Sequence, residues 1–374
     1  MQTIKSYARL EVGGSSMRLL YVVSSIPAFL GMGYLIFFIR RLLTEVLNIR
    51  VSNFVTLLIV AVAFALSVPA IDFFRVWAVG YYYFIAACLV FDIISLFIKN
   101  DFFKKAVHTG LISAIVVGLL IGYGYWNMNH VVKTDFNVST NKNVKLDILQ
   151  ISDLHLGQSI NPQQLEGYVK KMNQLHKDYV FLTGDIFDEA TKKTDMVKAC
   201  KILSSLKSEK GIYYVYGNHD DQKYGYSRSG NTDIFNHEDI KKELEKNHIN
   251  VLEDKVIEQD NVVIIGRADA SYQRETSEKL LKSVNKKKYV IVLDHQPLDM
   301  DENVKNGSDL QLSGHTHGGQ IWPMGTVQAL LTKTMRYGKK TIGNSTVITS
   351  SGIAGWGYPI KIGAPSEYAY IKVR

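Results

Sequence analysis

The C-terminal two thirds of the chain contains five short groups of aspartate, histidine and asparagine residues, and each group directly follows a short apolar run. In chain order they are Asp153-Leu-His155, Gly184-Asp185-Ile-Phe-Asp188, Gly217-Asn218-His219-Asp220, Asp294-His295-Gln-Pro297 and Gly314-His315-Thr-His317. Carboxylate, imidazole and amide oxygen are ligands that suit zinc, manganese and iron. A set of this size can hold two divalent ions that share a bridging carboxylate. With the ions roughly 3.5–4 Å apart, a metal-bridging hydroxide can attack a phosphorus atom while both ions neutralise the developing charge.

Each of these groups is a weak indication when taken alone. Asp-x-His occurs often by chance, Gly-Asp after a strand is usually a turn, and His-x-His can form an isolated zinc site. Five groups in one order, spread over 165 residues, are far more specific. Glycines directly before Asp185, Asn218 and His315 permit the tight turns and close backbone approach that such a site requires. The ordered set therefore predicts a dinuclear metal site.

The segments before these groups, and one further run, are typical of buried β-strands. They cover residues 145–151, 179–183, 212–216, 262–265, 289–293 and 310–313. Amphipathic helical patterns lie between several of them, at 162–176, 195–206 and 237–247. Such alternation predicts layered helices and sheets, and ligands of open α/β sheets bind beyond the carboxyl ends of the strands. We therefore expect the five groups to meet at one edge. Three other histidines lie in polar helical segments and are expected to be solvated: His176, His237 and His248.

The N-terminal third has a different character, because it contains four apolar segments of about the 20 residues that cross a hydrocarbon core. They lie at about 19–39, 51–71, 76–98 and 106–132. A cleavable signal peptide does not account for the first, because three more follow it. We therefore predict an α-helical transmembrane domain over residues 1–132 and an α/β domain over residues 133–374. Asp92 interrupts the third segment, either as part of a polar pathway or near the interface with a local partner.

The formal net charge of +8 is concentrated in the apolar third. Residues 1–130 carry ten Lys and Arg against five Asp and Glu, which leaves +3 for the remainder. This basic excess flanks apolar segments, where it sets topology or meets anionic headgroups, so we expect no nucleic-acid partner. Only two cysteines are present, Cys88 and Cys200, which excludes a disulfide framework or a cysteine metal cluster.

Positive charge in the loops also predicts the orientation in the cell membrane. With four spans, the α/β domain lies on the same side as the N-terminus. The loops after the first and third spans hold six Lys and Arg, whereas the N-terminal tail and the second loop hold four. This difference favours an extracytoplasmic catalytic domain. Lys133, Lys142 and Lys145, just after the last span, argue the other way.

The ordered groups resemble the pattern of the calcineurin-like metallophosphoesterase superfamily, which runs Asp-x-His, Gly-Asp-x-x-Asp, Gly-Asn-His-Asp/Glu, His and Gly-His-x-His. The run from His315 to Pro323 and the stretch from Ser351 to Glu367 are similar to a bacterial membrane-associated or exported subgroup. The resemblance implies a two-sheet, four-layer αββα sandwich and a metal-dependent phosphoric ester hydrolase. Two divalent ions, of Mn, Zn or Fe, would be its cofactors.

The resemblance also implies a role for each site residue. One ion would be bound by Asp153, His155 and His317, and the other by Asn218, His295 and His315. Asp185 would bridge both ions, and His219 would donate a proton to the leaving oxygen or stabilise phosphate. Asp188 and Asp220 would lie behind the ligands and orient imidazoles.

The substrate is less well defined by the sequence. Residues 222–236 follow the third group, and we hypothesise that they form a lip where Arg228 meets phosphate and Tyr224 and Tyr226 meet an organic group. A phosphate mono- or diester is expected, with a lipid- or nucleotide-linked one plausible at a bilayer. A catalytically silent metal-binding sensor or scaffold is the main alternative, and a transporter regulated by the α/β domain is a weaker one. Substrate, native metals and oligomeric state stay open.

Overall fold

The computed structural model describes residues 14–72, 75–222, 233–282, 284–332 and 334–374. The chain divides into two compact units, Met1–Trp126 and Asn127–Arg374, and each is described by itself. The lip residues Tyr224, Tyr226 and Arg228 lie outside the described residues.

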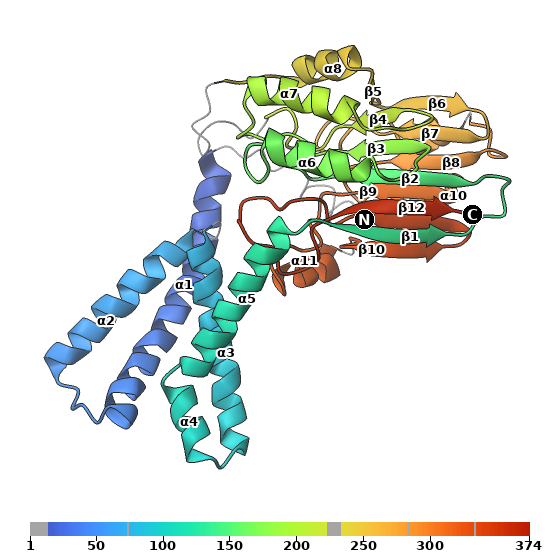
Figure 1. The fold of residues 1–374 in the computed structure, drawn as a ribbon. Coiled ribbons are helices and arrows are strands. Elements are labelled where there is room, and N and C mark those ends of the chain that lie inside the picture. Colours follow the sequence, from blue (N-terminus) through green and yellow to red (C-terminus); the bar gives the residue numbers. More distant parts are fainter. Residues whose placement is uncertain (1–13, 73–74, 223–232, 283, 333) are drawn as a thin grey trace. The chain divides into compact units, whose positions relative to one another are not determined.

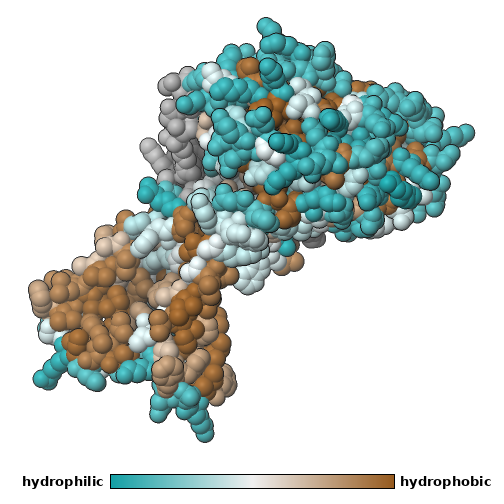
Figure 2. Space-filling model, in the orientation of Figure 1, coloured by the Kyte–Doolittle hydropathy of each residue, from teal (hydrophilic) through white to brown (hydrophobic). Residues whose placement is uncertain are grey.

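The N-terminal unit consists of helices. The helices are α1 (Gly14–Arg41), α2 (Asn53–Ser67), α3 (Val76–Phe97), α4 (Asp101–His108) and α5 (Leu111–Asn129). Two short helical turns, η2 (Leu42–Val46) and η3 (Val68–Ile71), follow α1 and α2. The last residues of α5, from Asn127 on, belong to the second unit. Four stretches are long and apolar enough to cross a membrane: Ser25–Val46, Asn53–Ile71, Val76–Phe97 and Leu111–Asn129. Figure 2 shows hydrophobic residues covering much of the visible surface of this unit, as expected for helices that face lipid.

The expected fourth apolar segment is interrupted in the structure. Residues 106–108 end the short helix α4, and α5 begins only at Leu111. Gly110, between them, has a positive φ of 72°, a conformation that ends a helix. The side chain of Asn100 caps α4 by accepting a hydrogen bond from the Phe103 amide at 2.9 Å.

Asp92 has partners within the N-terminal unit. Its carboxylate lies 2.9 Å from a guanidinium nitrogen of Arg41 and accepts a 2.8 Å hydrogen bond from the Tyr34 hydroxyl. The expectation of a local partner was therefore wrong, because both partners belong to α1 and lie more than 50 residues away in the chain. Pairing of this kind is how an acidic side chain is tolerated among apolar helices.

The C-terminal unit is a sandwich of two six-stranded sheets (Figure 1). The first sheet has, in spatial order, β1 (Val132–Val138), β12 (Glu367–Val373), β2 (Leu146–Ile151), β3 (Tyr179–Thr183), β4 (Ile212–Val215) and β5 (Asn250–Val251). The second has β10 (Gly338–Ile342), β11 (Ser345–Thr349), β9 (Leu310–Ser313), β8 (Tyr289–Leu293), β7 (Val262–Gly266) and β6 (Lys255–Gln259).

Three apolar layers hold the sandwich together. Inward-facing residues of both sheets, such as Ile148, Phe181 and Ile291, form one continuous core between the sheets. On the outside of the first sheet, apolar residues of α6 (Pro162–Met172), α7 (Lys193–Ser204) and α8 (His237–Lys246) form a second core. On the outside of the second sheet, α9 (Ser277–Lys282) forms a smaller one, and Asn303 of α10 (Met300–Lys305) donates a hydrogen bond to Gln311. The order of layers is αββα, as the resemblance implied.

The strands that carry the chemistry lie where they were expected. The bounds of β3, β8 and β9 agree with those predicted, and β2, β4 and β7 differ by one residue at one end. Neighbours β2, β3 and β4 are parallel, and so are β7, β8 and β9. Their carboxyl ends therefore meet at one edge of the sandwich, which is the edge that presents the site. The last helix, α11 (Met324–Thr332), lies beside β10 (Figure 1).

Candidate metal centre

Two compact groups of ligand atoms form at the carboxyl ends of the strands. Asp153, His155 and His317 make the first group, and Asp185, His295 and His315 make the second. Within each group, one candidate atom from every residue lies within 4.8 Å of the others. The loops after β2, β3, β8 and β9 thus bring together six of the predicted ligands. The loop after β4, which carries Asn218, reaches the second group through the backbone amide of His219.

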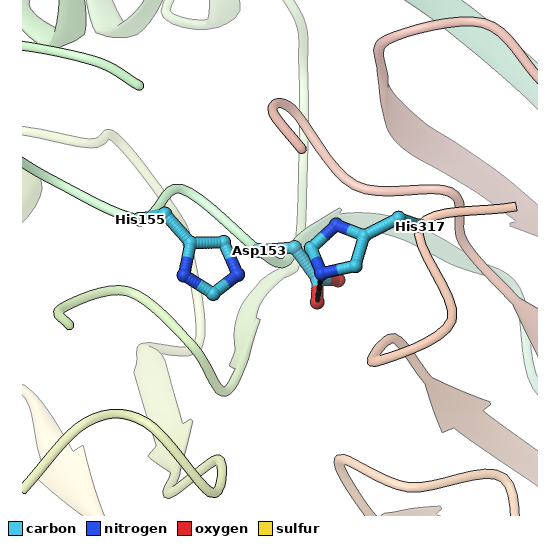
Figure 3. Close-up of side chains that lie close together, drawn as sticks. All are labelled: Asp153, His155 and His317. Atoms are coloured by element: carbon cyan, nitrogen blue, oxygen red, sulfur yellow. Dashed lines mark ion pairs between the residues drawn. The ribbon is translucent and has the colours of Figure 1, made fainter. Parts of the chain in front are cut away.

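The first group is built from the ends of β2 and β9. Figure 3 shows His155 and His317 reaching from two sides toward Asp153. The Nε2 atom of His317 lies 3.8 Å from an Asp153 carboxylate oxygen, and the two imidazole rings are 5.0 Å apart between centroids. The backbone amide of His315 donates to the same carboxylate at 3.0 Å, which fixes its direction.

The second group is centred on Asp185 at the end of β3. Its carboxylate lies 3.1 Å from Nε2 of His295, and the backbone amide of His219 donates to its other oxygen at 2.9 Å. The opposite ring nitrogen of His295, Nδ1, makes a 2.8 Å hydrogen bond to the carbonyl of Thr183. Asp185 is also 3.7 Å from Nε2 of His155, a member of the first group. It therefore lies between the two groups, where a bridging carboxylate would have to be.

Several buried polar atoms of the site make no hydrogen bond with any residue that the structure describes. They are both ring nitrogens of His155, Nε2 of His295 and Oδ1 of Asn218. Buried polar groups of native proteins are almost always satisfied, so these atoms call for a partner that is not protein. Imidazole nitrogen, carboxylate and amide oxygen are the ligands of zinc, manganese and iron, so the residues present fit such ions.

The backbone of the site is strained as well as tight. Five of the six residues in the two groups have positive φ values: Asp153 at 54°, His155 at 44°, Asp185 at 51°, His315 at 71° and His317 at 48°. A left-handed backbone in residues other than glycine costs of order 1–3 kcal/mol each and concentrates at functional sites. It turns the chain sharply after each strand, and so it aims two side chains only two residues apart into one place.

The expected close approach of glycine backbones is also seen. A Cβ atom added to Gly217 would lie 2.2 Å from an Asp185 carboxylate oxygen, and one added to Gly314 would lie 1.8 Å from Oγ of Ser152. Neither position can accommodate a side chain. The loops that carry Asn218 and His315 therefore pack directly against the carboxylates of the site.

Asp188 and Asp220 support the site in different ways. Asp188 lies 3.4 Å from Nδ1 of His155, a position from which it can orient that imidazole. Asp220 instead accepts hydrogen bonds from three backbone amides, those of Asp185, Phe187 and Gly217, at 2.6–2.9 Å. These contacts differ from the expected imidazole contact, because Asp220 folds the loops that carry Asp185 and Asn218.

The surroundings shift the pKa values of Asp153 and Asp185 in opposite directions. Burial raises the pKa of Asp153. Burial acts in the same direction on Asp185, but the positive charges of His295 and His219 hold the pKa of Asp185 well below its usual range. Burial and the charge of His295 lower the pKa of His315 to about 4, which leaves its imidazole neutral and able to bind a metal.

Sequence reasoning missed two neighbours of His219. Glu189 lies 2.9 Å from the Nδ1 atom of His219, and the ring of Trp356 lies 4.8 Å from its ring. Burial opposes protonation of His219, but the charge of Asp185 and the hydrogen bond to Glu189 raise its pKa to about 9. Glu189 directly follows Asp188 in the sequence, and this adjacency to a predicted group was the only sequence feature that could have indicated Glu189 as a site residue.

A buried lysine, also unassigned by sequence reasoning, supports the first group. Lys361 is fully buried and donates hydrogen bonds to the carbonyls of Ser351, Gly352 and Ala354, at 2.5, 3.0 and 3.1 Å. Burial lowers the pKa of this ammonium group to about 7. The carbonyl of Ala354 also lies 3.4 Å from Nδ1 of His317, so the lysine holds the loop on which that ligand rests.

The three histidines expected to be solvated are not all alike. His176 is 61 % exposed and lies 2.9 Å from Glu209, and His248 is exposed. His237 differs from the expectation, because its ring stacks on Tyr216 at 3.8 Å and pairs with Glu253 at 3.2 Å. None of the three belongs to the two ligand groups.

Comparisons with known proteins point in one direction. Residues 146–319 match the family model of the calcineurin-like phosphoesterases. A metallophosphoesterase of Aquifex aeolicus is 31 % identical over 242 residues, which cover 62 % of this chain and 87 % of that protein. A metallophosphoesterase of Helicobacter pylori is 30 % identical over 236 residues, 61 % of this chain and 60 % of the relative. A transmembrane protein with a metallophosphoesterase domain from Danio rerio is 26 % identical over 291 residues, 72 % and 65 % of the two chains. The match thus spans about 60 % of the Helicobacter relative's length.

Proposed function

The chain belongs to the calcineurin-like metallophosphoesterase family, and on that premise we propose that it is a membrane-anchored, two-metal hydrolase of phosphate mono- or diesters. One observation carries the proposal. Two groups of carboxylate and imidazole side chains converge at one sheet edge, with Asp185 between them, and several of their buried ligand atoms make no hydrogen bond with the described residues.

In this proposal each metal has its own ligands. The first ion is held by Asp153, His155 and His317, the second by Asn218, His295 and His315, and Asp185 is shared. Bound divalent cations would neutralise charge on the phosphate oxygens and lower the pKa of a water molecule. The identity of the metals, zinc, manganese or iron, is part of what the experiment decides.

His219 is the proton donor in this proposal. Its raised pKa keeps a proton on the imidazole, and Glu189 on Nδ1 orients the ring. An imidazolium beside the ligand groups can protonate the oxygen that leaves phosphorus, and it can also hold a phosphate oxygen. The ring of Trp356 packs beside this imidazole, with the ring centroids 4.8 Å apart.

Membrane anchoring is supported by the four apolar helical stretches and by the transmembrane relative from Danio rerio. We place the protein in the cell membrane as a multi-pass protein. The distribution of Lys and Arg in the connecting loops favours a catalytic unit outside the cytoplasm. Under this arrangement the substrate is a phosphoester within reach of the bilayer, such as a lipid- or nucleotide-linked one.

The test uses the full chain, purified in detergent. We would strip it of metal with a chelator, add back Mn²⁺, Zn²⁺ or Fe²⁺ one at a time, and follow hydrolysis of bis(p-nitrophenyl) phosphate and p-nitrophenyl phosphate. Asp185→Asn serves as the matched inactive control. We expect turnover that needs metal and is lost in the control, and the ratio of the two esters indicates the substrate class.

Two other outcomes would change the proposal. Two metals bound per chain without hydrolysis of either ester would favour the sensor or scaffold alternative. Absence of metal binding after reconstitution would contradict the proposed centre altogether.

A further inference from the structure

Helix α11, with Trp322 just before it, presents an unusual apolar surface on the catalytic unit. Each of its nine residues, all of which the structure describes, is at least partly exposed. The side chains of Met324, Val327, Leu330 and Leu331 are 63, 46, 75 and 80 % exposed, and Trp322 is 55 % exposed. Spacing of i, i+3, i+6 and i+7 places the four helix residues on one stripe. Large apolar side chains gathered in this way mark a contact surface.

This helix is held at both ends by the loops of the metal site. Before it, the side chain of Gln320 bonds to the carbonyls of Tyr358 and Ile360 and to the amide of Trp356, at 2.9–3.1 Å. After it, Arg336 donates to the carbonyls of Gly318 and Gly363. The exposed stripe is therefore a fixed feature beside the site.

Positive charges follow the apolar stripe in the chain. Lys339 and Lys340 of β10 follow α11 closely in the chain, and both are exposed. Lys339 donates a 2.7 Å hydrogen bond to the carbonyl of Asn137 in β1, so its ammonium group lies at the edge where β1 and β10 meet. An exposed apolar stripe flanked by lysines is the composition of a segment that lies in the interface of an anionic bilayer.

The first strand of this edge follows the last apolar helix directly in the chain. β1 begins at Val132, only three residues after α5 ends at Asn129. The amide of Val132 donates to the carbonyl of Ser366, next to Glu367, and Tyr337, between α11 and β10, donates to the Glu367 carboxylate at 2.8 Å. Along the chain, a bilayer that surrounds α5 therefore ends only a few residues before the start of β1, and an extended residue spans only about 3.3–3.6 Å.

We propose that the stripe of α11, with Trp322, inserts into the headgroup region of an anionic lipid bilayer beside the metal site. The catalytic unit then rests on the membrane through a second contact, besides the helices that anchor it. This inference rests on the proposed membrane anchoring but not on the proposed hydrolysis. Combined with the proposed hydrolysis, it favours a phosphoester displayed at a lipid surface as the substrate class.

The experiment places a fluorescent reporter on the stripe in the full chain, reconstituted in lipid nanodiscs. Cys88 and Cys200, both buried, are replaced by alanine. Leu330→Cys and Leu331→Cys, each labelled with an environment-sensitive dye, are compared with Lys242→Cys on α8, which packs by β5 at the opposite edge of the first sheet. Discs of phosphatidylcholine, with or without phosphatidylglycerol, contain lipids with a nitroxide quencher near the headgroup.

We expect blue-shifted emission and at least about twofold quenching at both stripe positions, and neither effect at the control position. Lys339→Glu combined with Lys340→Glu should reduce the quenching in anionic discs only. A blue shift without lipid quenching would mean that protein, such as a second copy of the chain, covers the stripe. Emission typical of water would mean that nothing covers it, and either result overturns the inference. Hydrolysis is not measured, so loss of the proposed activity would leave this result interpretable.

Discussion

The two ligand groups offer similar atoms, but the hydrogen bonds that fix the orientation of their imidazoles differ. The carboxylates Asp153 and Asp185 each accept a backbone amide bond, at 3.0 and 2.9 Å, so the difference lies in the imidazoles. In the second group, Nδ1 of His295 has a 2.8 Å bond to the Thr183 carbonyl. In the first group, Nδ1 of His155 lies 3.4 Å from the Asp188 carboxylate, and Nδ1 of His317 lies 3.4 Å from the Ala354 carbonyl. A ligand whose orientation is fixed in advance loses less freedom when a metal binds. The second group should therefore bind its ion more tightly.

The largest expected effect comes from the residue that the two groups share. Asp185→Asn removes a carboxylate oxygen from both groups, so we expect both metals to be lost and kcat to fall by about 1,000-fold. Metal content by elemental analysis and kcat with p-nitrophenyl esters measure the two effects. Retention of one full equivalent of metal would show that Asp185 does not bridge.

Single ligand substitutions sharpen the comparison between the groups. His295→Ala should abolish the tighter of two metal-binding steps, whereas His317→Ala should abolish only the weaker one. Calorimetric titration of the metal-free protein with Mn²⁺ or Zn²⁺ resolves the two steps. His176→Ala, at an exposed position, is the matched control and should retain both. If both ligand variants lost the same metal-binding step, the difference in imidazole orientation between the groups would have no effect on metal affinity.

A smaller effect on metal affinity is expected from Asp188, which contacts His155 of the first group. Asp188→Asn keeps the shape of the side chain but removes the charge facing His155, so metal affinity should fall by about 10–100-fold at the weaker step alone. Competition with a chelator of known affinity measures this change. An equal loss at both steps would indicate that Asp188 acts on the whole site.

The smallest expected effect on metal binding belongs to Lys361. Lys361→Met leaves three carbonyls of the loop beside His317 without their donor, which should lower the free energy of unfolding by about 1–3 kcal/mol. The weaker metal step should weaken slightly and the tighter one should not change. Urea unfolding of the metal-free protein, followed by metal titration, measures both. An unchanged unfolding midpoint would show that the lysine does not stabilise the loop.

Prediction from the sequence succeeded where one local signal decided the structure. Strands such as Tyr179–Thr183 and Tyr289–Leu293 are buried along their whole length, so an uninterrupted apolar run marked both ends. The convergence of Asp153, Asp185 and His295 followed from parallel strands, whose carboxyl ends share an edge.

Other features depend on contacts between distant parts of the chain and could not be predicted. The pairing of β1 with β12 joins residues more than 230 positions apart, and no local pattern selects such a partner. Glu189, Trp356 and Lys361 belong to the site only because their loops fold back against it. In the fourth apolar segment, Ala106 and Val107 extended the apolar run across Gly110, so the break between α4 and α5 was not predicted.

The left-handed backbone at the ligands also limits which residues evolution can place there. Asp, Asn and His tolerate positive φ better than most side chains, and β-branched residues tolerate it least. Glutamate would offer the same carboxylate as Asp153 or Asp185, but its longer chain lacks the short-range backbone bonding that stabilises this conformation in aspartate. The residue types allowed at these positions are thus limited by two requirements, metal coordination and a left-handed backbone conformation. Few substitutions satisfy both restrictions, so the site can change its substrate loops more readily than its ligands.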